Sequence, residues 1–425
     1  MIMDNTNDIK ILMESIGKKA SLASKILSNT TDKEKNIALR NISSNIRQDI
    51  NYILSENKKD LQKAAQNNKA TSIIDRLTLN SEKIESIALS IDSISKLTDP
   101  VGKILSEWEQ PNGLCIKRVT IPIGVIGIIY ESRPNVTADA AALCLKSGNA
   151  SILRGGSDSF YSCQAIYNSI RKGLSQSNLS EDSVQFVPTT DRNAVGYMLS
   201  GLNENIDVIV PRGGKSLVSR VREEARVPVF GHLEGICHVY IHKSADLKKA
   251  IAITLNSKMR RPSICGAAET LLIDKSIANK YLPQIIEALV NEGCEIRGDQ
   301  DVQAIDNRVT DVSDLDWDTE YLDAIISVRI VNDENQAIDH IMLHGTGHTE
   351  AIVTEDKSVS AYFTERVDSS IVLINASTQF ADGGEFGFGA EIGISTGRLH
   401  ARGPIGVDQL TTFKYIVTGN GQLRP

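Results

Sequence analysis

Cys265 is the side chain of this sequence best suited to covalent chemistry. It lies in the segment RRPSICGAAETLL, residues 260–272, shortly after two arginines and a proline. A thiol reacts as its thiolate, and nearby cationic charge favours that form. A helix is expected over residues 246–259, and Pro262 should end it before a strand over Glu269–Ile273. Cys265 should therefore lie in an accessible loop, as a candidate nucleophile. A lone cysteine is, however, often only a small buried apolar residue.

Three histidines spaced by four, His340, His344 and His348, are the next candidates. On one continuous helix they would stack as metal ligands can. Gly345 and Gly347 should end that helix after His344, so His348 should leave the shared face. We therefore expect no metal site here, and favour contact with an anionic substrate or a plain loop role.

Two glycine pairs follow expected strands, in Arg154-Gly155-Gly156-Ser157 and in Arg212-Gly213-Gly214. Glycine lets a backbone approach a ligand, and a helix N-terminus offers N–H groups to an anion. An ordinary tight turn explains either pair alone. The second pair is not a P-loop, because Ile209 stands where that motif needs glycine, and no GxGxxG fingerprint opens this sheet. Two such turns in one sheet still suggest a phosphate-bearing cofactor.

Asn135 lies between an expected strand and an expected helix, in the segment ESRPNVT over residues 131–137. Asparagine is a common helix N-cap. Its amide could instead donate to an oxyanion that develops during a reaction. The position alone favours the cap.

The composition is that of a globular enzyme or binding protein of more than one domain. The chain has 425 residues, 41% hydrophobic and 23% charged, with a formal net charge of −7. This charge gives no basic footprint for nucleic acid. Six scattered cysteines, without a CxxC pair, fit a reducing cytoplasm. We see no signal peptide and no apolar run long enough for a membrane span.

The first hundred residues read as helical. Thr31 and Glu34 form a capping box. Apolar residues then recur at steps of three and four, which predicts one helical stripe. A second helix should end before Asp99-Pro100. The stripes contain Leu39, Ile42, Ile46, Ile50 and Ile53, and Ile84, Ile87, Ile91 and Ile94.

From about residue 121, short β-branched runs alternate with helical segments, which predicts mostly parallel sheets covered on both faces. Two α/β domains in tandem follow, with a boundary near 235–245. Residues 298–323 should be rich in loops, and the glycine-dense segment 381–406 suits a loop that lines a site. The expected strands are 123–129, 151–153, 184–187, 207–210, 227–230, 237–241, 269–273, 324–331, 351–353 and 371–374.

These segments together resemble the aldehyde dehydrogenase superfamily and, within it, the γ-glutamyl phosphate reductases of proline biosynthesis. The matching runs lie in order over about 129–404. They are IYESRPNVT from 129, the run from Ala141 into Gly156, VPRGG from 210, CHVY from 237, the Cys265 segment, HGTGHTEAIVT from 344, and GISTGRLHARGP from 393.

The resemblance implies an α/β fold with two parallel-sheet domains and a small β oligomerisation element. A cofactor-binding domain would comprise 1–105 and 122–240, and a catalytic domain would comprise 241–403. The β element would pair 106–121, turning at Pro111-Asn112-Gly113, with a strand near 411–417 inside 404–425. A homo-oligomer, either a dimer or a tetramer, is therefore expected.

The resemblance also implies roles for single residues. Cys265 takes the place of the superfamily nucleophile, and Asn135 that of the oxyanion donor, acting with the backbone N–H of Cys265. Glu320 would hold the nicotinamide ribose of NADPH, and Arg154 could meet its 2′-phosphate. Further residues expected along the cofactor are Gly155, Gly156, Ser157, Pro188, Gly213 and Gly214.

One departure from the superfamily bears on the reaction. Hydrolytic members carry a glutamate on the loop before the strand at Cys237, where it activates water. Here His232 falls at that position and Glu234 two residues later, and neither is given a role. A reductase gains nothing from a water-activating base, because hydrolysis would discard its acyl intermediate. The mismatch thus favours reduction over oxidation.

The resemblance therefore implies NADPH-dependent reduction of L-glutamate 5-phosphate to L-glutamate 5-semialdehyde, with release of phosphate, through a Cys265 thioester in the cytoplasm. Functional coupling to glutamate 5-kinase is a further expectation. An oxidising aldehyde dehydrogenase and a non-catalytic dinucleotide-binding protein are the alternatives. The substrate's anionic groups need cationic partners. The candidates are Arg133, Arg261, His348, Arg398 and Arg402.

Overall fold

A computed structural model describes residues 5–424, which form two compact units. Unit 1 comprises residues up to Gly231 with 387–393 and 405 onwards, and unit 2 comprises 232–386 and 394–404. The division falls between Gly231 and His232, whereas the expected cofactor-binding domain ran on to residue 240. The expected β element clusters with unit 1. In the described part of the chain, no helix is long and apolar enough to cross a membrane.

Unit 1 begins with helices, as predicted. The capping box of Thr31 and Glu34 is present. The predicted apolar stripe is buried, with Leu39, Ile42, Ile46 and Ile53 at most 1% exposed, but it spans two helices that meet at Asp49. The Asp49 carboxylate accepts hydrogen bonds from Ser169 and Lys172 on a later helix, so a tertiary contact divides the helix there. The elements are α1 (Asn5–Leu27), α2 (Asp32–Gln48), α3 (Ile50–Gln66), α4 (Thr71–Leu77) and α5 (Ser81–Lys96).

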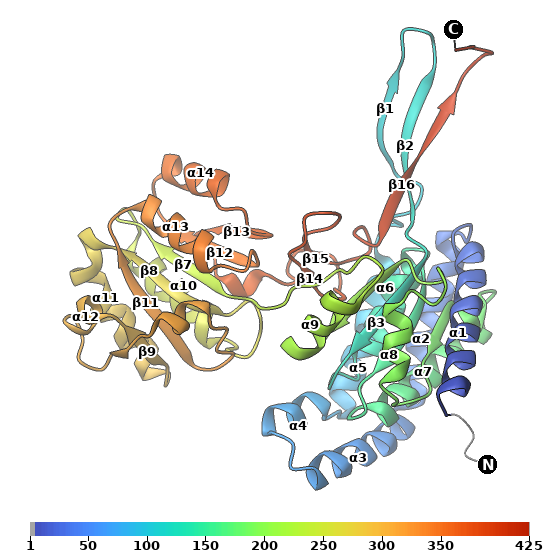
Figure 1. The fold of residues 1–425 in the computed structure, drawn as a ribbon, viewed down its shortest axis with the longest axis horizontal. Coiled ribbons are helices and arrows are strands. Elements are labelled where there is room, and N and C mark those ends of the chain that lie inside the picture. Colours follow the sequence, from blue (N-terminus) through green and yellow to red (C-terminus); the bar gives the residue numbers. More distant parts are fainter. Residues whose placement is uncertain (1–4, 425) are drawn as a thin grey trace. The chain divides into compact units, whose positions relative to one another are not determined.

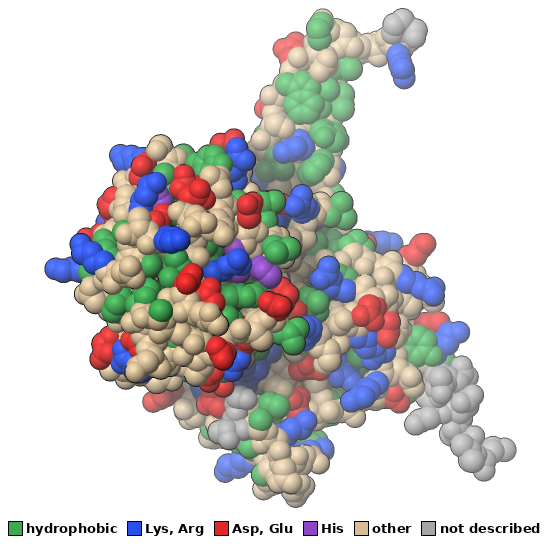
Figure 2. Space-filling view, turned by 60° about the vertical axis from the view of Figure 1, so that its left-hand side comes forward, with side chains coloured by type: hydrophobic (Ala, Val, Ile, Leu, Met, Phe, Trp, Pro, Cys, Tyr) green, Lys and Arg blue, Asp and Glu red, His purple; other side chains and the backbone are tan. Residues whose placement is uncertain are grey.

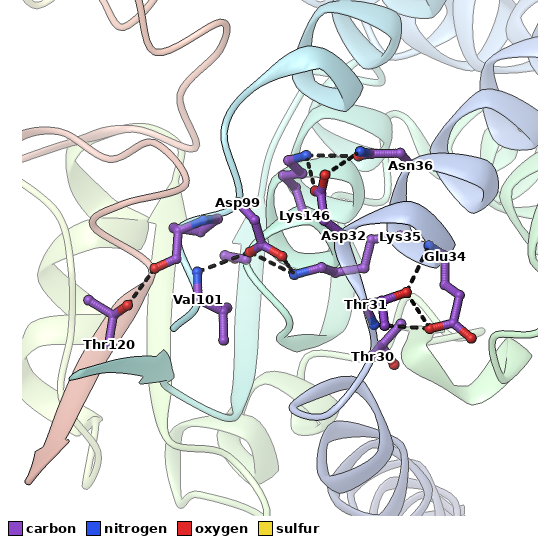
Figure 3. Close-up of polar contacts among 12 residues, drawn as sticks. Thr30, Thr31, Asp32, Glu34, Lys35, Asn36, Asp99, Val101, Thr120 and Lys146 are labelled. Carbon is purple, nitrogen blue, oxygen red and sulfur yellow. Dashed lines mark hydrogen bonds and ion pairs between the residues drawn. The ribbon is translucent and has the colours of Figure 1, made fainter. Parts of the chain in front are cut away.

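Two buried lysines tie these helices together (Figure 3). Lys146 is fully buried, and its ammonium donates to Asp32 at 2.6 Å and Asn36 at 2.8 Å. Lys35 is equally buried and pairs with Asp99 at 2.7 Å. Because a buried charge needs a partner, these pairs fix α2 against the ends of α5 and α6 (Val136–Lys146).

The main sheet of unit 1 is parallel, with strand order β5-β4-β3-β6. Strand β3 starts the sheet, β4 and β5 extend it on one side, and β6 joins on the other. The order thus reverses between β3 and β6. The strands are β3 (Val125–Tyr130), β4 (Ala150–Gly155), β5 (Val184–Phe186) and β6 (Val208–Arg212); the remaining helices are α7 (Phe160–Ser175), η1 (Glu181–Ser183), α8 (Asn193–Leu199) and α9 (Lys215–Glu224).

A three-stranded antiparallel arm belongs to the same unit (Figure 1). Strands β1 (Ile104–Glu109) and β2 (Cys115–Pro122) form the predicted hairpin, and β16 (Thr411–Thr418) pairs with β2 from Thr411↔Pro122 to Thr418↔Cys115. The predicted pairing of hairpin and C-terminal strand is therefore confirmed. The arm carries large exposed apolar side chains, visible in Figure 2. They include Trp108, Phe413, Tyr415, Ile416 and Val417.

Unit 2 is built on a seven-stranded sheet with order β10-β9-β11-β8-β7-β12-β13, whose paired strands are all parallel. Apolar cores cover both faces, as such a sheet requires. The strands are β7 (Cys237–Ile241), β8 (Ala268–Asp274), β9 (Glu295–Gly298), β10 (Thr310–Asp311), β11 (Ile325–Val331), β12 (Thr349–Val353) and β13 (Ile371–Ile374). The helices are α10 (Leu247–Met259), α11 (Lys275–Asn291), α12 (Gln300–Gln303), η2 (Asp314–Asp318), α13 (Glu334–His344), α14 (Lys357–Arg366) and η3 (Thr378–Phe380).

Two local predictions differ from the structure, whereas the segments expected to be rich in loops are so. The strand expected at 227–230 is reduced to a single bridge between Val229 and Ile209. The helix expected from Ser157 begins only at Phe160. The loop-rich segment 298–323 holds short elements, and 381–406 consists of turns around β14 (Ile394–Ser395) and β15 (Gly403–Pro404).

Candidate active site

The reactive side chains of unit 2 gather at one edge of its sheet. Because the strands are parallel, their amino ends meet at the same edge. His232 lies in the loop before β7, Cys265 in the loop before β8, and His348 directly before β12. These three strands are neighbours, so their loops converge. Ligands in open α/β sheets usually bind at carboxyl ends; here the candidate residues occupy the opposite edge.

Cys265 lies in the turn between α10 and β8, as predicted, and is half-buried. Residues at the start of the neighbouring strand β7 and just before it fix the loop of Cys265. The Cys237 thiol donates to the Cys265 carbonyl oxygen at 3.1 Å. A Cβ on Gly235 would come within 2.2 Å of that same oxygen, so only glycine fits there. The close approach fixes the backbone that presents the thiol.

Two histidines flank this thiol. Ligand atoms of His232, Cys265 and His348 all lie within 4.8 Å of one another, and the two imidazole rings meet edge to face with centroids 4.7 Å apart. His348 is fully buried, whereas His232 is half-buried. The prediction that His348 leaves the helix of His340 and His344 is correct, since α13 ends at His344.

Hydrogen bonds fix both rings. His232 Nδ1 lies 2.8 Å from the carbonyl oxygen of Ile394, which only accepts, so Nδ1 carries the proton and Nε2 keeps its lone pair in the neutral ring. His348 Nδ1 lies 2.9 Å from Thr349 Oγ1. Its Nε2 is buried and has no hydrogen-bond partner. The arrangement therefore places one oriented proton acceptor, His232 Nε2, and a second imidazole beside a nucleophile.

Glu320 lies before β11, at the same edge of the sheet. Its carboxylate accepts a hydrogen bond from the Gly235 N–H at 2.9 Å. The following turn is anchored from the core, because the Leu322 N–H donates to Glu269 at 3.3 Å. Glu269 in turn pairs with buried Lys258 at 2.5 Å. Burial raises the pKa of Glu269 to about 7, with Lys258 opposing that rise.

The cationic candidates of unit 2 separate into two groups. Arg398 and Arg402 both pair with Asp368, before β13, and hydrogen bonding to Arg402 lowers the pKa of that aspartate. Arg261 is exposed beside Cys265. Asp368 was not foreseen, since it lies thirty residues from its partners and in no recognisable motif.

In unit 1 the candidate residues lie at the carboxyl edge of the sheet. Asn135 precedes α6 but makes no capping hydrogen bond with its side chain, so the cap that its position favours is wrong. Its amide nitrogen instead donates to Asp139 at 3.0 Å. Asp139 also accepts from Ser90, and burial raises its pKa. The Asn135 amide is exposed, and one of its two N–H groups is held by this contact.

The Gly213-Gly214 turn opens α9, as predicted, at the point where the strand order reverses. Sequence reasoning missed its neighbour, Glu131. The Glu131 carboxylate accepts from the Gly214 N–H at 3.2 Å, and a Cβ on Gly213 would meet it at 2.5 Å. The glycines therefore leave room for an anion, and that room is filled by an internal carboxylate.

The first glycine turn differs from expectation in a similar way. Gly155 ends β4, and the chain continues through Gly156 and Ser157 before α7 starts. Asp158 fills this turn: it accepts from the Ser132 hydroxyl and backbone, and a Cβ on Gly156 would meet it at 2.5 Å. Both glycine turns are thus tied to the segment after β3.

Arg154 does not point outward as its proposed contact with a 2′-phosphate requires. It is 7% exposed, and its guanidinium donates to the carbonyls of Gly155, Thr190 and Asp191. Arg154 therefore braces the loop after β5, in which Pro188 is exposed. Arg133 is half-buried in the loop after β3.

Comparison with known proteins agrees with this architecture. The aldehyde dehydrogenase family model matches residues 13–304. The γ-glutamyl phosphate reductase of Parvibaculum lavamentivorans is 57% identical over 98% of this chain and 99% of its own. The chain belongs to the γ-glutamyl phosphate reductase family.

Solved structures place this reductase family member in the same fold. The γ-glutamyl phosphate reductase of Thermotoga maritima is 44% identical, with a TM-score of 0.95 over 97% of this chain and all of that one. An engineered glycolyl-CoA reductase with bound NADP+ is 14% identical, with a TM-score of 0.66 over 96% of each chain. The second likeness shows the fold alone.

Proposed function

We propose that this reductase converts L-glutamate 5-phosphate to L-glutamate 5-semialdehyde and phosphate with NADPH, through a thioester on Cys265. The observation that carries the proposal is the cluster of Cys265 with His232 and His348 at the amino edge of the sheet of unit 2, whose ligand atoms all lie within 4.8 Å of one another. Imidazole suits the proton transfers that accompany attack by a thiol and acyl transfer.

The first step joins sulfur to the acyl carbon. His232 Nε2 takes the proton of the Cys265 thiol as sulfur attacks, and the tetrahedral oxyanion then expels the phosphate group. The carbon–sulfur bond forms as the carbon–oxygen bond to phosphate breaks. The Asn135 amide is proposed as an oxyanion donor together with the Cys265 N–H; one such donor is typically worth about 3 kcal/mol.

The second step reduces the thioester and breaks its carbon–sulfur bond. The nicotinamide cofactor on which the aldehyde dehydrogenase family relies, proposed here as NADPH, would be held at its ribose by Glu320 and would supply the hydride that reduces the thioester carbon. The oxyanion of the resulting thiohemiacetal collapses, the semialdehyde leaves, and sulfur departs as thiolate. His232 holds the proton that balances this thiolate. Glu320, oriented by the Gly235 N–H, offers carboxylate oxygen to ribose hydroxyls.

The anionic groups of the substrate need cationic partners. Arg398 and Arg402 share Asp368, so a substrate phosphate or carboxylate would compete with that aspartate for them. Arg261 and Arg133 remain candidates, and His348 is proposed to contribute only if its buried Nε2 becomes protonated. The exposed apolar side chains of the three-stranded arm support a homo-oligomer, either a dimer or a tetramer. We further propose that this enzyme is cytoplasmic and is functionally coupled to glutamate 5-kinase.

The test is the reverse reaction, in which glutamate 5-semialdehyde and phosphate reduce NADP+. Activity should require phosphate and vanish in Cys265→Ala. Cys294→Ala is the matched control: that thiol lies in the same unit, is buried, and has a pKa raised by burial to about 12, so its removal should leave turnover intact. Phosphate-independent activity would indicate a hydrolytic dehydrogenase instead. Undiminished turnover in Cys265→Ala would exclude the thioester.

A further inference from the structure

The thiol–imidazole cluster has the composition of a site for a soft metal ion. In the described part of the chain, no other group of three or more His, Cys, Asp or Glu residues brings its ligand atoms so close together. We propose that His232, Cys265 and His348 bind one Zn²⁺ ion reversibly, and that the ion withdraws the Cys265 thiolate from reaction. This inference concerns metal binding and does not depend on which substrate the enzyme reduces.

The two rings are already oriented as metal-bound histidines are. A ligating imidazole usually donates its other N–H to a carbonyl or hydroxyl group, which fixes both the ring and its tautomer. His232 Nδ1 donates to the Ile394 carbonyl, so its lone pair is on Nε2. His348 contacts Thr349 through Nδ1. Its Nε2 is fully buried without a partner, and a metal ion would satisfy that atom.

The spacing is close to what zinc requires. Tetrahedral ligands about 2.0–2.3 Å from zinc lie about 3.3–3.7 Å from one another. The three ligand atoms are at most 4.8 Å apart, so no pair has to close by more than about 1.5 Å. Cys265 lies in a turn and is half-buried, as is His232, and the two can make this adjustment while buried His348 stays in place.

The ligand set selects the ion. Mg²⁺ and Ca²⁺ prefer oxygen ligands, whereas one thiolate and two imidazoles suit Zn²⁺. Three protein ligands leave a fourth position open to water. Binding removes the thiol proton and places the sulfur lone pair on the metal. The occupied protein should therefore resist alkylation at Cys265, and a chelator should restore its reactivity.

The experiment titrates the reduced full-length protein with Co²⁺, a spectroscopic substitute for Zn²⁺, and then displaces the cobalt with Zn²⁺. One ion should bind per chain with a thiolate-to-cobalt charge-transfer band that is absent in Cys265→Ala. Zn²⁺ affinity should fall about 100-fold or more in His232→Ala and His348→Asn. His344→Ala is the control, since that ring lies outside the cluster and pairs with Asp318; its Zn²⁺ affinity should stay unchanged.

A second readout is alkylation of Cys265, followed by mass spectrometry with and without Zn²⁺. Protection that a chelator reverses, and that both histidine substitutions abolish, supports the site even if catalysis is never measured. Zn²⁺ affinity that survives both histidine substitutions would overturn the proposal, as would a cobalt spectrum without the charge-transfer band. Circular dichroism shows whether His348→Asn has folded; if it has not, His232→Ala alone decides.

Discussion

The buried pair of Lys258 and Glu269 predicts an unequal response to the removal of either partner. Both side chains are at most 1% exposed and lie 2.5 Å apart. Glu269→Gln leaves an ammonium group buried without its counter-charge, which typically costs 3–5 kcal/mol, or roughly 4 kcal/mol here. Lys258→Met leaves a carboxyl group, which can escape the same penalty by taking up a proton.

The pKa of Glu269 decides how much the second variant loses. Burial raises this pKa to about 7 even with Lys258 beside it, so it rises further once the lysine is gone. At pH 7 the carboxyl group of Lys258→Met is then neutral when folded. The remaining loss is that of an imperfectly paired polar group, about 1–3 kcal/mol.

The pH dependence follows from the same shift. Because the folded pKa of Glu269 lies above its unfolded value, the folded state binds more protons, and stability is lost as pH rises through the folded pKa. In the wild type this loss ends near pH 7. In Lys258→Met it continues upward at about 1.4 kcal/mol per pH unit until the new folded pKa is reached. The difference between the two proteins should therefore grow above pH 7.

Urea unfolding from pH 6 to pH 9, followed by Trp317 fluorescence, measures these free energies. Trp317 is buried in unit 2, and a Trp108→Phe background removes the second tryptophan, which lies on the arm. If Lys258→Met lost as much unfolding free energy as Glu269→Gln at pH 6–7, the reasoning would be refuted. A constant gap between Lys258→Met and the wild type from pH 7 to pH 9 would also refute it.

Three further predictions concern unit 1. Asp139→Ala should release the Asn135 amide. It should lower kcat about tenfold or more and change KM little, as expected when the lost interaction is made mainly in the transition state. An unchanged kcat would show that Asp139 does not position Asn135. Glu131→Gln should tighten binding of NADP+, measured by calorimetry, because it removes the carboxylate that occupies the Gly214 N–H; weaker binding would show that the carboxylate supports the turn. Lys146→Met should destabilise the protein by about 1–3 kcal/mol in thermal unfolding at neutral pH, because the charged hydrogen bonds to Asp32 and Asn36 are lost while the half-exposed Asp32 carboxylate stays hydrated; a loss above about 4 kcal/mol would contradict that estimate.

Periodicity and turn signals predicted the strands that carry the site. The structure gives two strands the bounds that the sequence predicted, Cys237–Ile241 and Ile371–Ile374. Their runs of β-branched residues, and not any reactive side chain, made them recognisable. The hairpin turn at Asn112-Gly113 predicted the arm. What the sequence could not show is contact between residues far apart in the chain. Asp49 divides a helix because Ser169 and Lys172 reach it from 120 and 123 residues away.

The same limit applies to the site. Cys265 and His348 were recognisable from their local segments, whereas the convergence of His232 with them follows from the order of β8, β7 and β12. Glu131 and Asp158 fill the two glycine turns, and no motif distinguishes them from ordinary surface acids. Arg154 was expected to meet a 2′-phosphate because it falls where many members of the superfamily carry a lysine, yet its guanidinium donates to the carbonyls of Gly155, Thr190 and Asp191.

The amino-edge location of the reactive residues in unit 2 has a consequence for variation of the chain. Every loop that leaves the carboxyl end of β7, β8, β11 or β12 lies a full strand length from Cys265. Asn332 and Glu355 in these connections are exposed, and exposed loop positions tolerate changes of length. Peptide insertions after residue 332 or 355 should therefore leave the chemistry unaltered, and these positions offer attachment points for surface immobilisation or fusion. Insertions of equal length before the same strands should abolish the reaction.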